Sequence, residues 1–172
     1  EKRPFFLEGR KILSFEVEDE DQLFYSRRVG APPSGVPFLG PEEEMTSLPD
    51  STTILGAFKL TGRTEGGTSV AVLQAFTQKE TVSVTSPFGQ RDAVVEPFGS
   101  YTVGRIHKDW DKGNTSLGGM LTSTHRWAED APLASFLPSQ ATTGGIDFTR
   151  YFADREWVLE ANGVASHVTG DP

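Results

Sequence analysis

Carboxylates at regular spacing are the first sign of possible chemistry in this sequence. Asp109, Asp111 and Gly113 are spaced like the start of a calcium-binding loop. However, Gly113 stands where such a loop needs a side-chain oxygen, and Met120 stands where it needs a bidentate glutamate. We therefore interpret this segment as a hairpin turn and expect neither a metal ion nor an organic cofactor.

The histidines and the remaining carboxylates give little further indication of a metal site or of catalysis. The histidines lie on different predicted strands, with no second histidine at metal-ligand spacing: His107, His125 and His167. Asp147, Glu156 and Glu160 fall on the polar faces of one predicted hairpin, where two of them could serve as a glycosidase pair. A polar lining of the sheet explains the same pattern, so we favour a non-catalytic role.

The densest polar cluster lies near the N-terminus and contains Glu8, Tyr25, Arg27 and Arg28. One interpretation is an arginine–carboxylate network that braces the N-terminal segment. The other is a binding site for an acidic or sugar ligand, because arginine forks bind carboxylates and tyrosine stacks on sugars. On a strand, Arg27 would share the face of Tyr25 and pair with Glu8, while Arg28 would point away. We expect the structural role.

Composition narrows the class of protein. The 172 residues carry a net charge of −8, which argues against nucleic acid as a partner because a phosphate-binding surface must be basic. There is no cysteine, and hence no disulfide scaffold or thiolate metal site. The 18 glycines and 11 prolines indicate a turn-rich β protein. Because the chain lacks an initiator methionine and a secretion signal, we expect it to be an internal part of a longer polypeptide.

The sequence predicts two parts that differ in composition and in secondary structure. Residues 1–51 are acidic and loop-rich, with eleven Asp and Glu against six Lys and Arg in the first fifty. Two short strands are expected there, at about 10–16 and 22–29. Residues 52–172 form the second part, an antiparallel meander of β-hairpins with no helix longer than two turns.

Strands and turns alternate regularly in the second part. Glycine, asparagine and aspartate near 64–67, 111–114 and 153–154 supply the positive φ angles of tight hairpin turns. Long loops are expected at 79–97 and 128–141. The predicted strands pair in sequential order and cover residues 52–63, 67–78, 98–110, 115–127, 142–152 and 155–168. Their alternation fits an all-β fold, either a barrel segment or a soluble sandwich.

Aromatic residues favour the barrel. One group lies beside the tight turns (Trp110, Tyr151, Phe152 and Trp157) and the other near the long loops (Phe76, Phe98, Tyr101 and Trp127). The nine steps from Tyr101 to Trp110 span about 30 Å, or about 21 Å along the membrane normal at a tilt of about 45°. That approaches the apolar band of about 25 Å of an outer-membrane barrel. Five side chains are expected to face lipid: Leu121, Ile146, Phe148, Trp157 and Leu159.

Several sequence motifs resemble an uncharacterised bacterial family, and together they cover nearly the whole chain. They occupy residues 1–9, 23–30, 54–64, 70–77, 101–105 and 145–148. In that family a carbohydrate-binding module of the family-nine type precedes a domain of unknown function, which is expected to be an outer-membrane β-barrel. This chain resembles the start of that domain. The module itself is missing here, so no sugar-binding residue is carried over.

Together, these features predict a non-catalytic segment of a bacterial outer-membrane β-barrel. Its partners would be outer-membrane lipid and, through the missing module, carbohydrate, in a protein concerned with carbohydrate binding or uptake. Two alternatives from other classes stay open. One is a glycoside hydrolase that uses the carboxylates named above, and the other is a soluble β-sandwich binding module.

Overall fold

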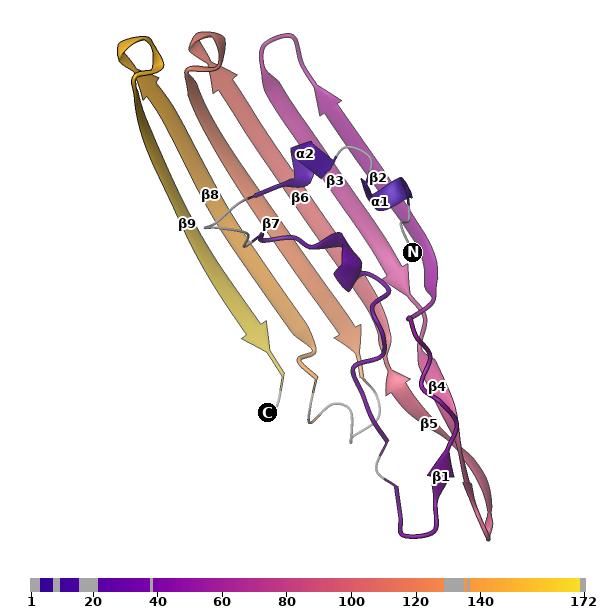
Figure 1. Ribbon diagram of the computed structural model, residues 1–172. Helices are drawn as coiled ribbons and strands as arrows, with labels where there is room; N and C mark the ends of the chain where they lie inside the picture. Colours follow the sequence, from indigo (N-terminus) through magenta and orange to yellow (C-terminus); the bar gives the residue numbers. More distant parts are fainter. Residues whose placement is uncertain are drawn as a thin grey trace.

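Six long antiparallel strands form the main sheet (Figure 1). The computed structural model describes residues 4–7, 10–15, 22–37, 39–128, 135 and 137–170. The order in the sheet is that of the chain: β2 (Ile54–Arg63), β3 (Thr68–Thr77), β6 (Phe98–Trp110), β7 (Thr115–Trp127), β8 (Gln140–Phe152) and β9 (Trp157–Thr169). The prediction of six sequentially paired strands is confirmed, with each boundary within two residues.

Tight turns join β6 to β7 and β8 to β9. Each contains one 3-10 turn, η2 (Asp111–Gly113) or η3 (Ala153–Arg155). The left-handed backbone is adopted by Lys112 at φ 56° and Gly113 at φ 86°, and by Asp154 at φ 55° in the second turn. Gly113 suits this conformation because it lacks the Cβ that makes positive φ costly. The segment that resembles a calcium loop is therefore a hairpin turn, as predicted.

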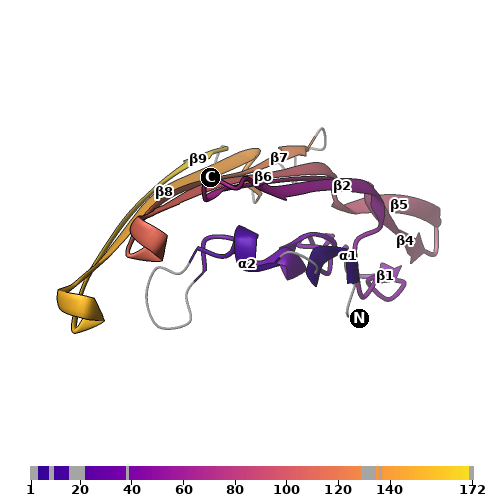
Figure 2. The ribbon, with the colours of Figure 1, turned by 90° about the horizontal axis from the view of Figure 1, so that it is seen from above.

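The N-terminal segment differs from the prediction. Where strands were expected at about 10–16 and 22–29, the structure has the helical turns α2 (Arg10–Leu13) and η1 (Ser26–Arg28). A further helical turn, α1 (Pro4–Leu7), precedes them. The prediction was wrong because this segment does not join a sheet edge but crosses the concave side of the main sheet (Figure 2). Its apolar side chains, among them Leu13 and Phe15, are buried there.

A second sheet replaces the long loop expected at 79–97. It has three antiparallel strands in the order β1 (Glu44–Met45), β4 (Glu80–Ser86) and β5 (Gly89–Glu96). Val82, Val84, Ala93 and Val95 alternate along the hairpin and form a small core of their own. The loop prediction was wrong because the polar residues between these positions occupy the outward face of a strand, where they are as common as in a loop. Hydrogen bonds from Arg91, and then from the Gly40 amide, lower the pKa of Glu43 to about 2, so this exposed pair stays ionised.

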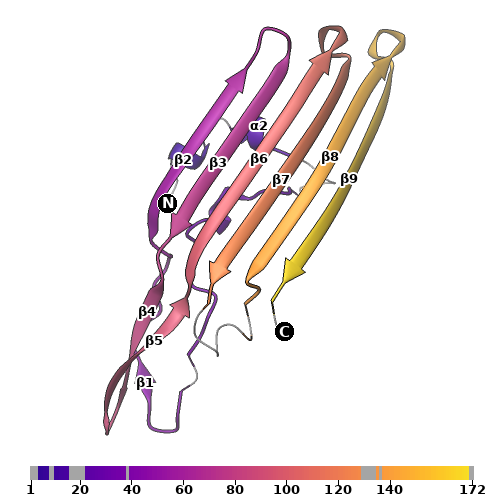
Figure 3. The ribbon, with the colours of Figure 1, turned by 180° about the vertical axis from the view of Figure 1, so that it is seen from behind.

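Alternation along each strand separates two faces of the main sheet. In β3 every second residue from Ser69 to Thr77 is buried, whereas the residues between them are partly or fully exposed. The buried positions lie on the concave face and pack against the N-terminal segment in one cluster: Phe6, Leu13, Phe15, Val29, Ala71, Leu73, Ala75, Tyr101, Val103 and Met120. No described segment covers the opposite, convex face (Figure 3).

Candidate functional site

The predicted N-terminal cluster is only partly brought together. Arg27 lies over the Tyr25 ring, with its guanidinium carbon 5.9 Å from the ring centroid. Arg27 and Arg28 are both exposed and belong to a 3-10 turn, so the strand alternation used to separate them does not apply. Glu8 lies outside the described residues. A binding role for the four residues stays a prediction.

The carboxylates considered for hydrolysis do not converge on an open cleft. Asp147 is bound by Arg105, with 2.5 Å between a carboxylate oxygen and a guanidinium nitrogen. Glu160 lies on the exposed edge strand β9, opposite Thr149, and Glu156 follows the turn η3. Among the described residues, no three His, Cys, Asp or Glu side chains are grouped so as to hold a metal ion.

Arg105 and Asp147 are the centre of a buried contact that sequence reasoning missed. The Arg105 side chain is 6% exposed and stacks on the Phe15 ring, 5.0 Å from its centroid. Gly118 lies under the pair, and a Cβ there would stand 2.4 Å from the Asp147 carboxylate. An arginine and an aspartate on two strands, facing a glycine on the strand between them, are the signal that could have revealed this contact.

Gly145 makes room for Phe15 in the same region. A Cβ at Gly145 would lie 2.7 Å from Cζ of Phe15. Because Phe15 is 2% exposed, its ring has little space into which it could retreat. This glycine therefore positions the N-terminal segment on the sheet.

A substitution at Gly145 should therefore release the N-terminal segment. We expect Gly145→Ala to lower the free energy of unfolding by about 1–3 kcal/mol through overpacking against Phe15. Gly144→Ala is the matched control, because a Cβ at Gly144 points to the other face and meets ordinary contacts at 3.7 Å or more. Thermal unfolding and proteolysis of residues 1–30 measure the effect. Equal behaviour of the two variants would contradict this role of Gly145.

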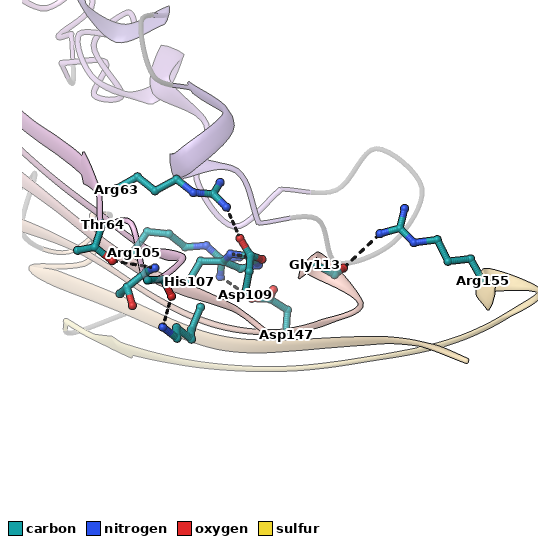
Figure 4. Close-up of polar contacts among 11 residues, drawn as sticks. Arg63, Thr64, Arg105, His107, Asp109, Gly113, Asp147 and Arg155 are labelled. Atoms are coloured by element: carbon teal, nitrogen blue, oxygen red, sulfur yellow. Dashed lines mark hydrogen bonds and ion pairs between the residues drawn. The ribbon is translucent and has the colours of Figure 1, made fainter. Parts of the chain in front are cut away.

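Further polar contacts continue along the concave face (Figure 4). Arg63 of β2 pairs with Asp109 of β6 at 2.6 Å, and His107 Nδ1 lies 3.5 Å from the same carboxylate group. Beyond them, Arg155 donates to the side chain of Asn114 at 3.0 Å and links the two 3-10 turns. At the opposite end of the sheet, Arg126 of β7 pairs with the buried Glu96 at the end of β5, at 3.5 Å.

The convex face differs from the concave face in carrying no strand carboxylate. The six strands contain three carboxylates, Asp109, Asp147 and Glu160, and strand register places all three on the concave side. The middle of the convex face carries exposed aliphatic side chains. The most exposed of them are Leu60, Ile106, Leu121 and Ile146, each at 54–65%. Of the five residues expected to face outward, four are exposed and Phe148 is half-buried.

Aromatic residues lie near both ends of the convex face. At the long-loop end a row of uncharged polar side chains separates them from the aliphatic band: Gln74, Ser100, Thr102, Ser123 and Thr142. Near the tight turns lie Trp110, Phe152 and Trp157, which is 70% exposed. At the other end Phe76 stacks on Phe98 with ring centroids 6.4 Å apart, and the Trp127 ring lies tilted against Phe98 at 5.1 Å. For two of the aromatic residues assigned to these groups the prediction was wrong, because they lie on the concave side. Tyr101 is 9% exposed in the concave core, and the register of Tyr151 with Val158 places it on the concave side.

A shallow depression crosses the aliphatic band. Glycines make up much of its floor, and Val72, Ile106, Leu121 and Ile146 rise beside them. The convex-face glycines of the depression are Gly104, Gly119, Gly144 and Gly163. A Cβ at any of the four would meet nothing closer than 3.7 Å, and none has a positive φ. The described chain itself therefore does not require glycine at these positions.

The strands and turns define an all-β antiparallel meander that is open at both edges. Residues 1–137 match the family model described as "Domain of unknown function (DUF5916)", and the chain belongs to that family. This confirms the resemblance to a domain of unknown function, while the carbohydrate-binding module and the membrane barrel stay predictions. No curated protein and no solved structure matches the chain. In the described part of the chain, no helix is long and apolar enough to cross a membrane.

Proposed function

We propose that this chain is part of the wall of an outer-membrane β-barrel, with its convex face against lipid and its N-terminal segment inside. The observation that carries the proposal is the uncovered convex face, where an aliphatic band without carboxylates lies between two rows of aromatic residues. This is the pattern of side chains that a bilayer favours on a barrel exterior. Water would disfavour so large an exposed apolar surface.

The dimensions of the sheet agree with this proposal. From Phe98 to Trp110 the strand β6 takes twelve steps, or about 40 Å at 3.3 Å per residue. At a tilt of about 45° this distance spans about 28 Å, close to the apolar band of about 25 Å. In a closed barrel, further strands would pair with the open edges of β2 and β9, which would otherwise favour aggregation.

The concave face supports the same arrangement, because it carries the three strand carboxylates as well as the apolar cluster that holds the N-terminal segment. Barrel interiors are polar and can be filled by a segment of the chain. Here the N-terminal segment fills that side, and Phe15 packs beneath Arg105. A role in carbohydrate binding or uptake rests only on the family resemblance, because the described residues show no open sugar-binding cleft on the concave face.

Flotation with vesicles tests the proposal. The full chain, refolded from urea in the presence of phosphatidylcholine vesicles, should float with them through a sucrose gradient and resist alkaline extraction. Without vesicles or detergent it should aggregate, because the convex face would be exposed to water. A monomer that is stable in buffer and stays in the dense fraction would contradict the proposal and favour a soluble binding module.

A further inference from the structure

The convex-face glycines have no explanation within the described chain. Gly118 and Gly145 on the concave face are needed, because a Cβ there would clash at 2.4 Å or 2.7 Å. Gly119 and Gly144, their neighbours on the convex face, would tolerate a side chain. A glycine inside a strand weakens it and often marks a place where a ligand approaches closely. The depression is therefore shaped for something outside the described chain.

Two cations stand between the depression and the tight turns. Arg150 and Lys108 are the only Lys or Arg on the convex face of the six strands. Arg150 is exposed, and its guanidinium lies 5.1 Å from the centroid of the Phe152 ring. The Lys108 ammonium donates to the carbonyl of Gly66 in the turn between β2 and β3. Lys108 is therefore directed away from Arg150, which lies two strands further along the sheet on β8. No strand carboxylate shares this face to neutralise them.

The spacing suits an amphiphile with an anionic head. On β8, Gly144 and Ile146 lie six and four residues from Arg150, or about 13–20 Å along the strand. At a tilt of about 45° this corresponds to a depth of about 9–14 Å, within half of a hydrocarbon core of about 30 Å. A head group at Arg150 would thus place its acyl chain over the depression.

We propose that the convex face holds an acidic phospholipid, whose phosphate lies at Arg150 and whose acyl chain occupies the glycine-floored depression. This inference rests on the proposed membrane location and names the lipid class. A second copy of the chain fits less well, because its convex face has no strand carboxylate that could pair with Arg150.

Lipid retention tests the inference. The full chain is reconstituted in equimolar dioleoylphosphatidylglycerol and dioleoylphosphatidylcholine, extracted in mild detergent and analysed by native mass spectrometry. Wild type should retain phosphatidylglycerol in preference to phosphatidylcholine. Arg150→Gln should lower this preference about fivefold, the weight of one interfacial cation, and Arg150→Lys should restore most of it. Gly119→Leu should abolish retention of both lipids.

Matched controls separate the possible outcomes. Gly62→Leu fills another convex-face glycine outside the depression, and Lys79→Gln removes an exposed cation beyond the end of β3. Both should retain lipid like the wild type. Equal retention of the two lipids by wild type, or retention unchanged in Gly119→Leu, would overturn the inference. If wild type floats with vesicles in those cases, the membrane proposal survives, whereas a chain that neither floats nor retains lipid overturns both.

Discussion

Leu121→Arg should destabilise the vesicle-inserted protein by about 2–4 kcal/mol, the cost of a cation at the bilayer midplane on the lipid face of a barrel. Leu121 lies in the middle of β7 and is 54% exposed on the convex face. In the bilayer the guanidinium introduced by Leu121→Arg would have neither water nor a carboxylate nearby. In water the same change at an exposed site would alter stability by no more than about 0.5 kcal/mol.

The adjacent residue provides the control for this prediction. Thr122 is half-buried and, by strand alternation, points to the concave side. Thr122→Arg should therefore lower the free energy of unfolding of the vesicle-inserted protein distinctly less than Leu121→Arg does. Urea titration of the vesicle-inserted protein, followed by far-UV circular dichroism, measures both. If Leu121→Arg is the milder of the two, the convex face does not face lipid.

Among substitutions on the concave face, Asp147→Ala should lower the free energy of unfolding the most. It would leave the Arg105 guanidinium, which is 6% exposed at its side chain, without its carboxylate partner. Removal of one partner from a buried pair typically costs 3–5 kcal/mol, and we expect about 3 kcal/mol because Asp147 itself retains some contact with solvent. The Phe15 contact should loosen as well, since Arg105 holds that ring.

Asp109→Ala is the matched control for Asp147→Ala. Asp109 also pairs with an arginine, at 2.6 Å, but the Arg63 side chain is 63% exposed. This pair should contribute about 1 kcal/mol or less. Denaturant unfolding and proteolysis of the N-terminal segment compare the two variants. Equal losses would show that burial does not distinguish the two ion pairs.

The main sheet could be predicted from sequence because local signals agree along it. Period-two alternation in β8, with Ile146 and Phe148 on one face and Asp147 on the other, marks the strand. Positive-φ residues such as Gly113 and Asp154 mark the turns. Such signals are local, so they locate elements without showing what covers each face.

Packing between distant segments could not be predicted. The acidic N-terminal part contains short apolar runs that suit a strand as well as a helical turn. The helical turn forms because these runs pack on the concave face of the sheet, which the local sequence does not show. Tyr101 and Trp127 look alike in sequence, yet one is buried and the other exposed, because strand register decides the face. The Arg105–Asp147 pair joins residues 42 positions apart.

The three tryptophans allow the most direct test of the membrane assignment, because all of them lie on the convex face. Single-tryptophan variants, made by Trp→Phe changes, are inserted in vesicles with lipids brominated at defined depths. We expect brominated lipid to quench Trp110, Trp127 and Trp157, most strongly near the head groups, and aqueous iodide to quench them little. Strong iodide quenching of all three, without quenching by brominated lipid, would contradict the account.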